Sequence, residues 1–279
     1  MMTSDAHTAL ITGASSGLGA AFARKLASQG YGLVLVARRE KRLVQLATIL
    51  QRQYPIHVEV LVADLAQAAD FERVEKRIAE LTNLELLVNN AGFGVPGKFA
   101  EVPLNRTLEM IDVHVGASTR LSRAALPGMI VRGGGGIINV ASIGAFIPRP
   151  QDAVYCATKA YLVAFSRALQ GELEGTGVRV QVLCPGFVPT EFLDHPEYEA
   201  LQVKGKIPQL LWTPVGVVVE ESLRSLERGK VICIPGFKNR TIVVFARSGL
   251  AGILLKILAN NLRKPNPLSV PQPSLKREH

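Results

Sequence analysis

The chain has 279 residues, of which 48% are hydrophobic and 20% are charged, and its formal net charge is +9. This composition is typical of an ordered globular protein long enough to bury a large core, as one large α/β domain or two small ones. The excess charge lies from residue 201 onward, where 13 Lys and Arg stand against 4 Asp and Glu, whereas residues 1–200 balance at 19 against 19. Because the body of the chain has no basic bias, we expect no nucleic-acid partner.

The three cysteines, Cys156, Cys184 and Cys233, stand in apolar contexts without metal-ligand spacing. We therefore expect buried thiols in a reducing, cytoplasmic compartment and no metal site. Residues 1–7 lack the regions of a signal peptide, and no uninterrupted apolar run reaches the roughly 18 residues of a spanning helix.

A glycine-rich turn follows the first apolar segment. A strand is expected over 8–12, the turn runs from Gly13 to Gly19, and a helical pattern covers 20–29. Glycines permit a tight turn and close backbone approach, and a helix N-terminus presents free N–H groups to an anion. A second apolar strand over 32–37 should run parallel to the first. The unit predicts a dinucleotide phosphate site.

The residues after the second strand bear on the choice of cofactor. A site that prefers NAD commonly has an acid there, whereas this chain has Arg38 and Arg39. An arginine can bind a 2′-phosphate through charge-assisted hydrogen bonds, so we expect NADP, with Arg38 as the better candidate and Ser15 as a second phosphate contact. Alternatively, the two arginines only open a solvated helix over 40–53.

The third and fourth strands are expected over 57–63 and 84–88. Asp64 and Leu65 follow the third strand, where a carboxylate could meet an adenine edge or cap the helix over 67–81. The fourth strand leads into Asn89-Asn90-Ala91-Gly92.

A possible catalytic group begins at the end of the fifth strand. Ser142 follows an apolar run, and Tyr155 and Lys159 are four residues apart on a helix expected to reach about residue 174. That spacing places both side chains on one face, where an ammonium would favour phenolate and lower the tyrosine pKa. Ser142 could hold a carbonyl oxygen while Tyr155 delivers a proton to it. Taken alone, a tyrosine and a lysine at this spacing usually belong to a solvated helix face.

Together these residues resemble the short-chain dehydrogenase/reductase family over roughly residues 6–235. The matching motifs are Thr12-Gly13-x-x-x-Gly17-x-Gly19, Asp64, Asn89-Asn90-Ala91-Gly92, Ser142, Tyr155-x-x-x-Lys159, and Pro185-Gly186 with Thr190. The resemblance implies one Rossmann-type domain, a doubly wound parallel sheet of about seven strands with helices on both faces. It also implies reversible hydride transfer between NAD(P) and a carbonyl or alcohol.

The resemblance also implies a set of site residues. Ser142, Tyr155 and Lys159 would be catalytic, and the segment after the sixth strand, expected over 178–183, would flank the nicotinamide. The expected cofactor-binding residues are Thr12, Gly13, Ser15, Ser16, Gly17, Leu18, Gly19, Arg38, Asp64, Leu65, Asn90, Ala91, Gly92, Tyr155, Lys159, Pro185, Gly186, Val188 and Thr190.

One position departs from the family pattern. On the helix expected over 105–131, the place of an asparagine that holds a water in the proton path is taken by His114. Histidine can donate and accept, and its ordinary pKa of about 6.5 suits a relay. The alternative is that His114 only packs in a polar gap of the helix.

The remaining segments are less regular. Residues 191–213 form a substrate loop or an ordinary surface loop, and their apolar content favours a hydrophobic substrate. A helix over 215–228 and a last strand over 231–234 complete a catalytic domain of residues 1–237. Residues 238–264 read as a basic amphipathic extension that lies in a membrane interface, packs across an oligomer partner or covers the pocket, and 265–279 as a disordered tail.

The sequence thus predicts an NADP(H)-dependent oxidoreductase acting on a ketone, aldehyde or secondary alcohol. A hydrophobic acyl or steroid-like substrate is favoured over a small polar carbonyl, and we expect a homo-oligomer. A non-catalytic NADP(H)-binding regulator would have no reason to hold Ser142, Tyr155 and Lys159 together. A membrane-associated scaffold would rest on the C-terminal extension alone.

Overall fold

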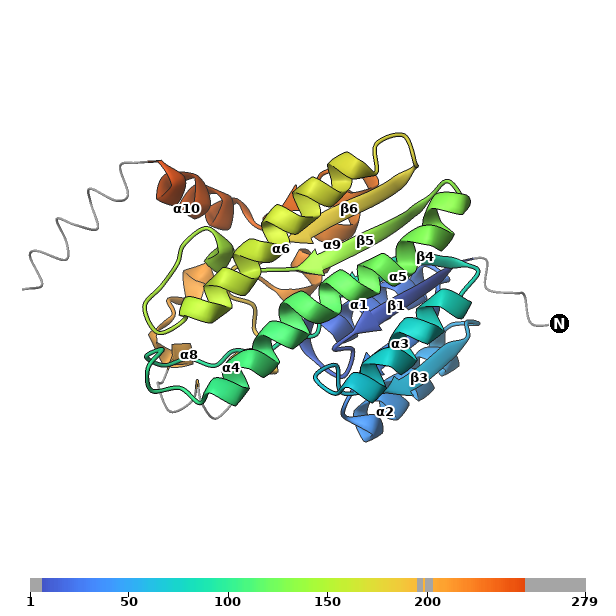
Figure 1. Ribbon diagram of the computed structural model, residues 1–279, viewed down its shortest axis with the longest axis horizontal. Coiled ribbons are helices and arrows are strands. Elements are labelled where there is room, and N and C mark those ends of the chain that lie inside the picture. The colour runs from blue at the N-terminus through green and yellow to red at the C-terminus, as the bar shows by residue number, and fades with distance from the viewer. Residues whose placement is uncertain (1–6, 195–197, 199–202, 249–279) are drawn as a thin grey trace, which may run out of the picture.

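The computed structural model describes residues 7–194, 198 and 203–248, which surround a seven-stranded parallel sheet with helices on both faces (Figure 1). The strand order is β3-β2-β1-β4-β5-β6-β7. The strands are β1 (Thr8–Thr12), β2 (Gly32–Ala37), β3 (Val58–Val62), β4 (Leu84–Asn89), β5 (Gly135–Val140), β6 (Val178–Leu183) and β7 (Ile232–Cys233). The predicted single-domain, Rossmann-type doubly wound sheet is confirmed.

Two layers of helices bury the sheet. Helices α1 (Gly17–Ser28), α2 (Glu40–Gln53) and α9 (Val215–Glu227) cover one face, and α3 (Ala68–Glu80), α5 (Ser118–Val131) and α6 (Ala153–Glu172) cover the other. Successive strand residues point to opposite faces, so Ala9 and Ile11 join the first layer and Leu10 the second. Strands buried on both sides must be apolar throughout, which explains the unbroken apolar runs in the sequence.

The direction of chain winding reverses between β1 and β4. These strands are hydrogen-bonded neighbours, although β2 and β3 follow β1 in sequence and extend the sheet on its other side. Loops that leave the carboxyl ends of β1 and β4 therefore diverge and leave a crevice, which is where ligands bind in open α/β sheets. The fold thus fixes the place of the site before any functional side chain is considered.

The helix expected over 105–131 is interrupted by a π-helical turn. It consists of α4 (Leu104–Ile111), η1 (Asp112–Ala117) and α5, without a break between them. A π-turn inserts one extra residue into a helix and often occurs at a functional site. His114 lies in this turn and is only 1% exposed.

The C-terminal part is built of short elements. The structure describes η3 (Glu191–Asp194), α8 (Val203–Lys206) and η4 (Gln209–Leu211) in the expected substrate loop, and α10 (Phe237–Arg247) where the extension was expected to begin. Helix α10 buries Asn239 and Val243, and Asn239 donates a hydrogen bond to Thr213 (3.2 Å). The rest of the extension and the tail, residues 249–279, lie outside the described residues.

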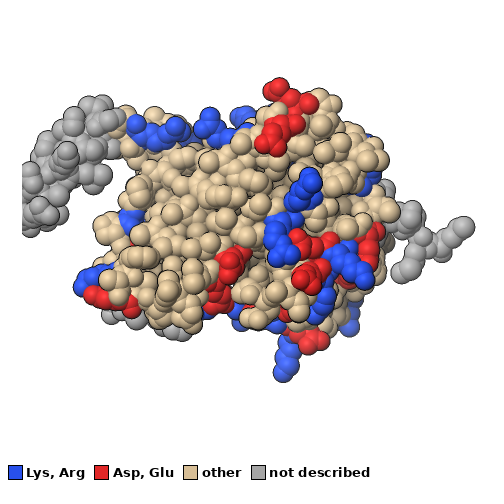
Figure 2. Space-filling view, in the orientation of Figure 1, with Lys and Arg blue, Asp and Glu red and all other residues tan. Residues whose placement is uncertain are grey.

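The surface is uneven in charge. Figure 2 shows a broad area with few charged side chains over α6, while Lys and Arg side chains gather near α10, which carries Lys238, Arg240 and Arg247. Leu104 and Leu108 on α4 are 65% and 50% exposed. Among the helices in the described ranges, none is both long and apolar enough to cross a membrane.

Candidate active site

A cavity of about 620 Å³ opens at the carboxyl ends of the strands, and the loops after β1 to β6 line it together with the first turns of α6. The sequence-predicted cofactor and catalytic residues line this cavity with three exceptions: Thr12, Gly19 and His114. These three residues contact residues of the cavity lining: Thr12 contacts Asn90, Gly19 contacts Gly13 and His114 contacts Phe93. The fold therefore brings together predicted residues that are up to 177 positions apart, from Gly13 to Thr190.

The glycine turn has the geometry of a phosphate cradle. Gly17 has a φ of +54°, and a Cβ on Gly19 would lie 2.3 Å from the carbonyl oxygen of Gly13, so neither position tolerates a side chain. The backbone at Ser16 is extended, and helix α1 begins at the next residue, with its N-terminus at the cavity. Free N–H groups at a helix start bind anions. These residues fit a dinucleotide pyrophosphate.

Hydrogen bonds tie the loop after β4 to the glycine turn. The hydroxyl of Thr12 accepts from the backbone N–H groups of Asn90 and Ala91, both at 2.9 Å, and the Asn90 amide donates to the Thr12 carbonyl at 2.8 Å. Thr190, after β6, packs against Gly17. Three loops are thereby held in fixed positions around one crevice.

Arg38 and Arg39 point in different directions after β2. Arg39 donates from Nε and Nη2 to the Ser15 hydroxyl (3.1 and 3.0 Å) and from Nη2 to the Ser16 hydroxyl (2.7 Å). The Arg38 guanidinium instead lies 3.7 Å from the Asp64 carboxylate. The structure therefore places Arg39, and not Arg38, beside Ser15, while both arginines line the cavity and the choice of Arg38 as the phosphate contact stays a prediction. Consecutive residues of an extended segment alternate in direction, and only Arg39 reaches back over the glycine turn.

Asp64 lines the cavity after β3 and does not cap α3. Its Oδ1 accepts from the Ala66 backbone N–H at 3.1 Å, whereas α3 begins after Gln67. The capping alternative is therefore wrong in detail, since Asp64 closes the turn that precedes the helix. Its other oxygen faces Arg38.

Ser142, Tyr155 and Lys159 converge on one wall of the cavity. The Ser142 hydroxyl accepts from the Gly144 N–H at 3.1 Å, and the Ser142 and Tyr155 side chains both border Gly144. The Lys159 ammonium nitrogen lies 5.6 Å from the centre of the Tyr155 ring and donates to the Val140 carbonyl at 3.0 Å. This last bond joins α6 to the end of β5.

Burial controls the protonation of this group. It raises the pKa of Tyr155 to about 12, against the opposing effects of the Ser142 hydrogen bond and the Arg149 charge. Burial also lowers the pKa of Lys159 to about 7. The tyrosine pKa is therefore raised and not lowered as expected, because removal of the phenol from water outweighs the opposing effects of Ser142 and Arg149. Tyr155 therefore keeps its proton at neutral pH.

His114 lies beside this group with both ring nitrogens engaged. Nε2 is within 3.2 Å of the Phe93 backbone N–H, which donates to it, and Nδ1 is 2.9 Å from the Thr158 hydroxyl. Burial and the nearby Lys159 charge lower the pKa of His114 well below its ordinary value. Its ring meets that of Tyr155 edge to face, with centroids 5.9 Å apart. The premise of an ordinary histidine pKa is thus wrong, and the imidazole is neutral.

Sequence reasoning missed part of the lining. Phe192 stacks near Tyr155 with ring centroids 5.9 Å apart, and Tyr198 follows it at 5.5 Å. Arg149 and Asp152 form an ion pair of 2.8 Å at the same end of the cavity. The signals were present, since these aromatics lie in the expected substrate loop and Asp152 precedes α6, but their direction depends on the fold.

Comparisons with known proteins agree with this geometry. The family model for short chain dehydrogenases matches residues 7–198. The very-long-chain 3-oxoacyl-CoA reductase of Anas platyrhynchos is 36% identical over 200 residues, which cover 68% of this chain and 63% of that protein. This chain therefore spans less than two thirds of that relative.

Solved structures share the fold across nearly the whole chain. The short-chain dehydrogenase from Sphingobium yanoikuyae in complex with NADPH has a TM-score of 0.77 and 30% identity, covering 95% of this chain and 99% of that one. The bulky-bulky ketone specific alcohol dehydrogenase from Comamonas testosteroni has a TM-score of 0.75 and 28% identity, covering 96% and 98%. The matched region and the converging Ser142, Tyr155 and Lys159 lead to one conclusion: this chain is an oxidoreductase of the short-chain dehydrogenase family.

Proposed function

We propose that this enzyme uses NADP(H) to interconvert a bulky, apolar ketone or aldehyde and its alcohol. The observation that carries the proposal is the convergence of Ser142, Tyr155 and Lys159 on one wall of the cavity, with Lys159 one helical turn beyond Tyr155. The position of Arg39 beside Ser15 supports the phosphorylated cofactor. The NADPH complex of the Sphingobium yanoikuyae relative supports it as well.

The two ends of the cavity would hold different halves of the cofactor. The glycine turn, Arg39 and Asp64 would hold the adenosine half, and Tyr155, Lys159 and the segment 185–190 the nicotinamide half. When bound, the nicotinamide supplies a hydride for reduction or accepts one for oxidation.

Ser142 and Tyr155 would both bind the carbonyl oxygen of the substrate. The Ser142 oxygen already accepts from Gly144, which leaves its hydrogen free to point at a second acceptor. Tyr155 keeps its proton at neutral pH because burial raises its pKa, so it can donate that proton to the developing alkoxide. A protonated Lys159 stabilises the phenolate that remains.

Replacement of Tyr155 by phenylalanine tests the proton-donor role. We expect Tyr155→Phe to lower turnover by about 10²-fold or more and to leave the Kd for NADPH nearly unchanged, because the hydroxyl acts only on the reacting oxygen. Steady-state kinetics and fluorescence titration measure the two quantities. Tyr161→Phe is the matched control, since Tyr161 lies on the same helix and its hydroxyl contacts Thr119. Near-normal turnover of Tyr155→Phe would rule out the role.

The buried Lys159 makes stability depend on pH. Its pKa is about 7 in the folded enzyme, against 10.5 for a lysine in water. Between these two values the unfolded chain binds more protons, so the free energy of unfolding rises with pH. We expect the slope for the wild type to exceed that for Lys159→Met by up to about 1.4 kcal/mol per pH unit.

Urea denaturation at several values between about pH 7.5 and 9.5 measures both slopes. Tyr155 and Cys233 affect both proteins alike, so their contributions cancel in the comparison. Cys184 interacts with Lys159, so both proteins carry Cys184→Ser, which removes its titration. Equal slopes would show that Lys159 keeps its ordinary pKa in the folded enzyme.

We further propose that His114 supports the site as a neutral hydrogen-bonding residue. It holds the Phe93 backbone and Thr158 in place behind Tyr155, and its lowered pKa opposes a role as a charged relay. A water relay through the imidazole, as suggested by the family pattern, would require one ring nitrogen to leave its present partner.

Two variants separate these roles of His114. We expect His114→Ala to lower turnover roughly tenfold through misplacement of Tyr155, with the Kd for NADPH intact. If His114 stays neutral, the pH profiles of kcat for the wild type and for His114→Asn should have the same shape near pH 6.5. An ionisation that disappears in His114→Asn would favour the relay, and unchanged turnover of both variants would leave His114 without a catalytic role.

The apolar lining supports a hydrophobic substrate. Phe93, Phe192 and Tyr198 face the catalytic end, and Pro96 and Leu193 extend the same wall. The two named relatives act, by their descriptions, on very-long-chain 3-oxoacyl-CoA and on bulky-bulky ketones. The ion pair of Arg149 and Asp152 in the same region keeps a smaller polar carbonyl as the alternative.

A panel of ketones and aldehydes tests cofactor and substrate together. We expect faster loss of reduced-nicotinamide absorbance with NADPH than with NADH, and a higher kcat/KM for long-chain 3-oxoacyl or polycyclic ketones than for small polar carbonyls. A higher kcat/KM for small polar carbonyls would overturn the substrate class without affecting the assignment of Tyr155.

We also propose that the enzyme is a homo-oligomer. The surface over α6 carries few charged side chains (Figure 2), and Leu104 and Leu108 on α4 add exposed apolar side chains to a possible contact area. Peripheral membrane contact through the C-terminal extension stays a prediction, because most of that extension lies outside the described residues.

A further inference from the structure

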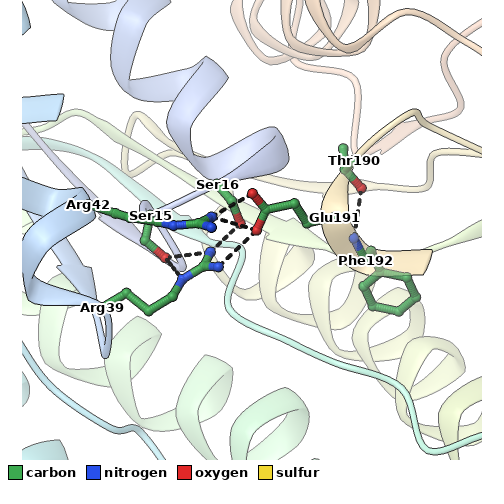
Figure 3. Close-up of polar contacts among 7 residues, drawn as sticks. All are labelled: Ser15, Ser16, Arg39, Arg42, Thr190, Glu191 and Phe192. Atoms are coloured by element: carbon green, nitrogen blue, oxygen red, sulfur yellow. Dashed lines mark hydrogen bonds and ion pairs between the residues drawn. The ribbon is translucent and has the colours of Figure 1, made fainter. Parts of the chain in front are cut away.

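The arginines after β2 already bind an anion of the chain itself. Figure 3 shows Arg39 and Arg42 converging on the carboxylate of Glu191, the residue that follows Thr190. Arg39 Nη1 lies 2.8 Å from Oε2, and Arg42 Nη1 lies 2.5 and 2.7 Å from the two carboxylate oxygens. The contact joins elements that are about 150 residues apart, with separations of 152 and 149 positions.

The remaining donors of Arg39 are also engaged. The Nε and Nη2 groups of the guanidinium donate to the hydroxyls of Ser15 and Ser16 in the glycine turn. The Nη1 group donates to the Glu191 carboxylate (Figure 3). A phosphate that is to be held by this guanidinium through paired hydrogen bonds must therefore take donors from one of these partners. Serine hydroxyls can rotate to donate to a phosphate, whereas a carboxylate has no proton to offer.

Glu191 is a charged and exchangeable partner. The two arginines lower the pKa of its carboxyl, so it is ionised at neutral pH. The side chains of Arg39, Arg42 and Glu191 are 44%, 47% and 46% exposed, and exposed ion pairs are worth little. A phosphate ester with up to two negative charges would repel the carboxylate and can replace it at modest cost.

We propose that Glu191 is an internal competitor for the 2′-phosphate of the cofactor and thereby sets how strongly the site prefers NADP(H) over NAD(H). A cofactor with the 2′-phosphate displaces the Glu191 carboxylate from Arg39 and Arg42. A cofactor without it leaves the ion pairs in place. The inference rests on the proposed binding of NADP(H) in this cavity.

The competition has a structural consequence at the catalytic end. Phe192 follows Glu191 directly, its N–H donates to the Thr190 hydroxyl at 3.4 Å, and its ring lies beside that of Tyr155. Release of Glu191 therefore frees the backbone next to an aromatic residue of the catalytic wall. The adenosine and nicotinamide ends are connected through two consecutive residues.

Binding of cofactor fragments tests the competition without turnover. Isothermal titration with 2′,5′-ADP and with 5′-AMP reports the contribution of the 2′-phosphate alone. We expect Glu191→Gln to tighten 2′,5′-ADP by about threefold to fivefold and to leave 5′-AMP unchanged, since the amide pairs only weakly with the arginines. Thermal unfolding of each variant confirms that it is folded.

Asp194→Asn is the matched control. Asp194 lies in the same short helix, its side chain is 47% exposed, and it pairs with Lys204 at 2.5 Å, away from the two arginines. This variant removes the same charge and should change neither affinity. A gain for 2′,5′-ADP of the same size in Asp194→Asn would show a general charge effect and overturn the proposal.

Arginine variants separate this inference from the proposed cofactor preference. We expect Arg39→Ala to weaken 2′,5′-ADP about tenfold or more, and Arg38→Ala to have a smaller effect. If the wild type binds 2′,5′-ADP and 5′-AMP equally, the proposed preference for NADP(H) is contradicted. If Glu191→Gln then binds 2′,5′-ADP more tightly than 5′-AMP, the competition by Glu191 is still supported. Unchanged or weaker binding of 2′,5′-ADP to Glu191→Gln would overturn the competition even where the wild type prefers that fragment.

Discussion

The hydrogen bond from Lys159 to the Val140 carbonyl is the interaction on which the active site depends. It brings a buried amine to the end of β5 and so fixes the rotation of α6 about its axis. Tyr155, one turn earlier on the same face, then meets Ser142, which follows that strand. Because both side chains are buried, water does not stabilise their charged forms. Burial therefore raises the pKa of Tyr155 and lowers the pKa of Lys159.

The two ends of the cavity use electrostatics in opposite ways. At the adenosine end, Arg39, Arg42 and Glu191 are about half exposed, so their pairing is weak, sensitive to salt and easily exchanged. At the catalytic end, Tyr155 and Lys159 are buried, and small changes in their surroundings shift their pKa values strongly. Exchangeable charges suit the recognition of a cofactor that enters and leaves, and buried groups suit a proton transfer that must occur in one geometry.

Local patterns predicted the individual strands and helices, and the family resemblance supplied the sheet and most of the site lining. The bounds of β1, β2 and α2 agree with the apolar runs and the polar residues that end them, because these signals lie within the segments themselves. The choice between Arg38 and Arg39, the raised pKa of Tyr155 and the partners of His114 required the fold. Side-chain direction and burial depend on residues that are distant in sequence, so the adjacent residues predict them poorly.

The π-turn between α4 and α5 has a consequence for how this enzyme can change. Its additional residue shifts the helical phase between α4 and α5 by about 100°. Loss of a single codon within 112–117 would restore a regular helix and rotate one half relative to the other. In this stretch, the number of residues therefore sets how α4, with its exposed Leu104 and Leu108, is turned relative to α5.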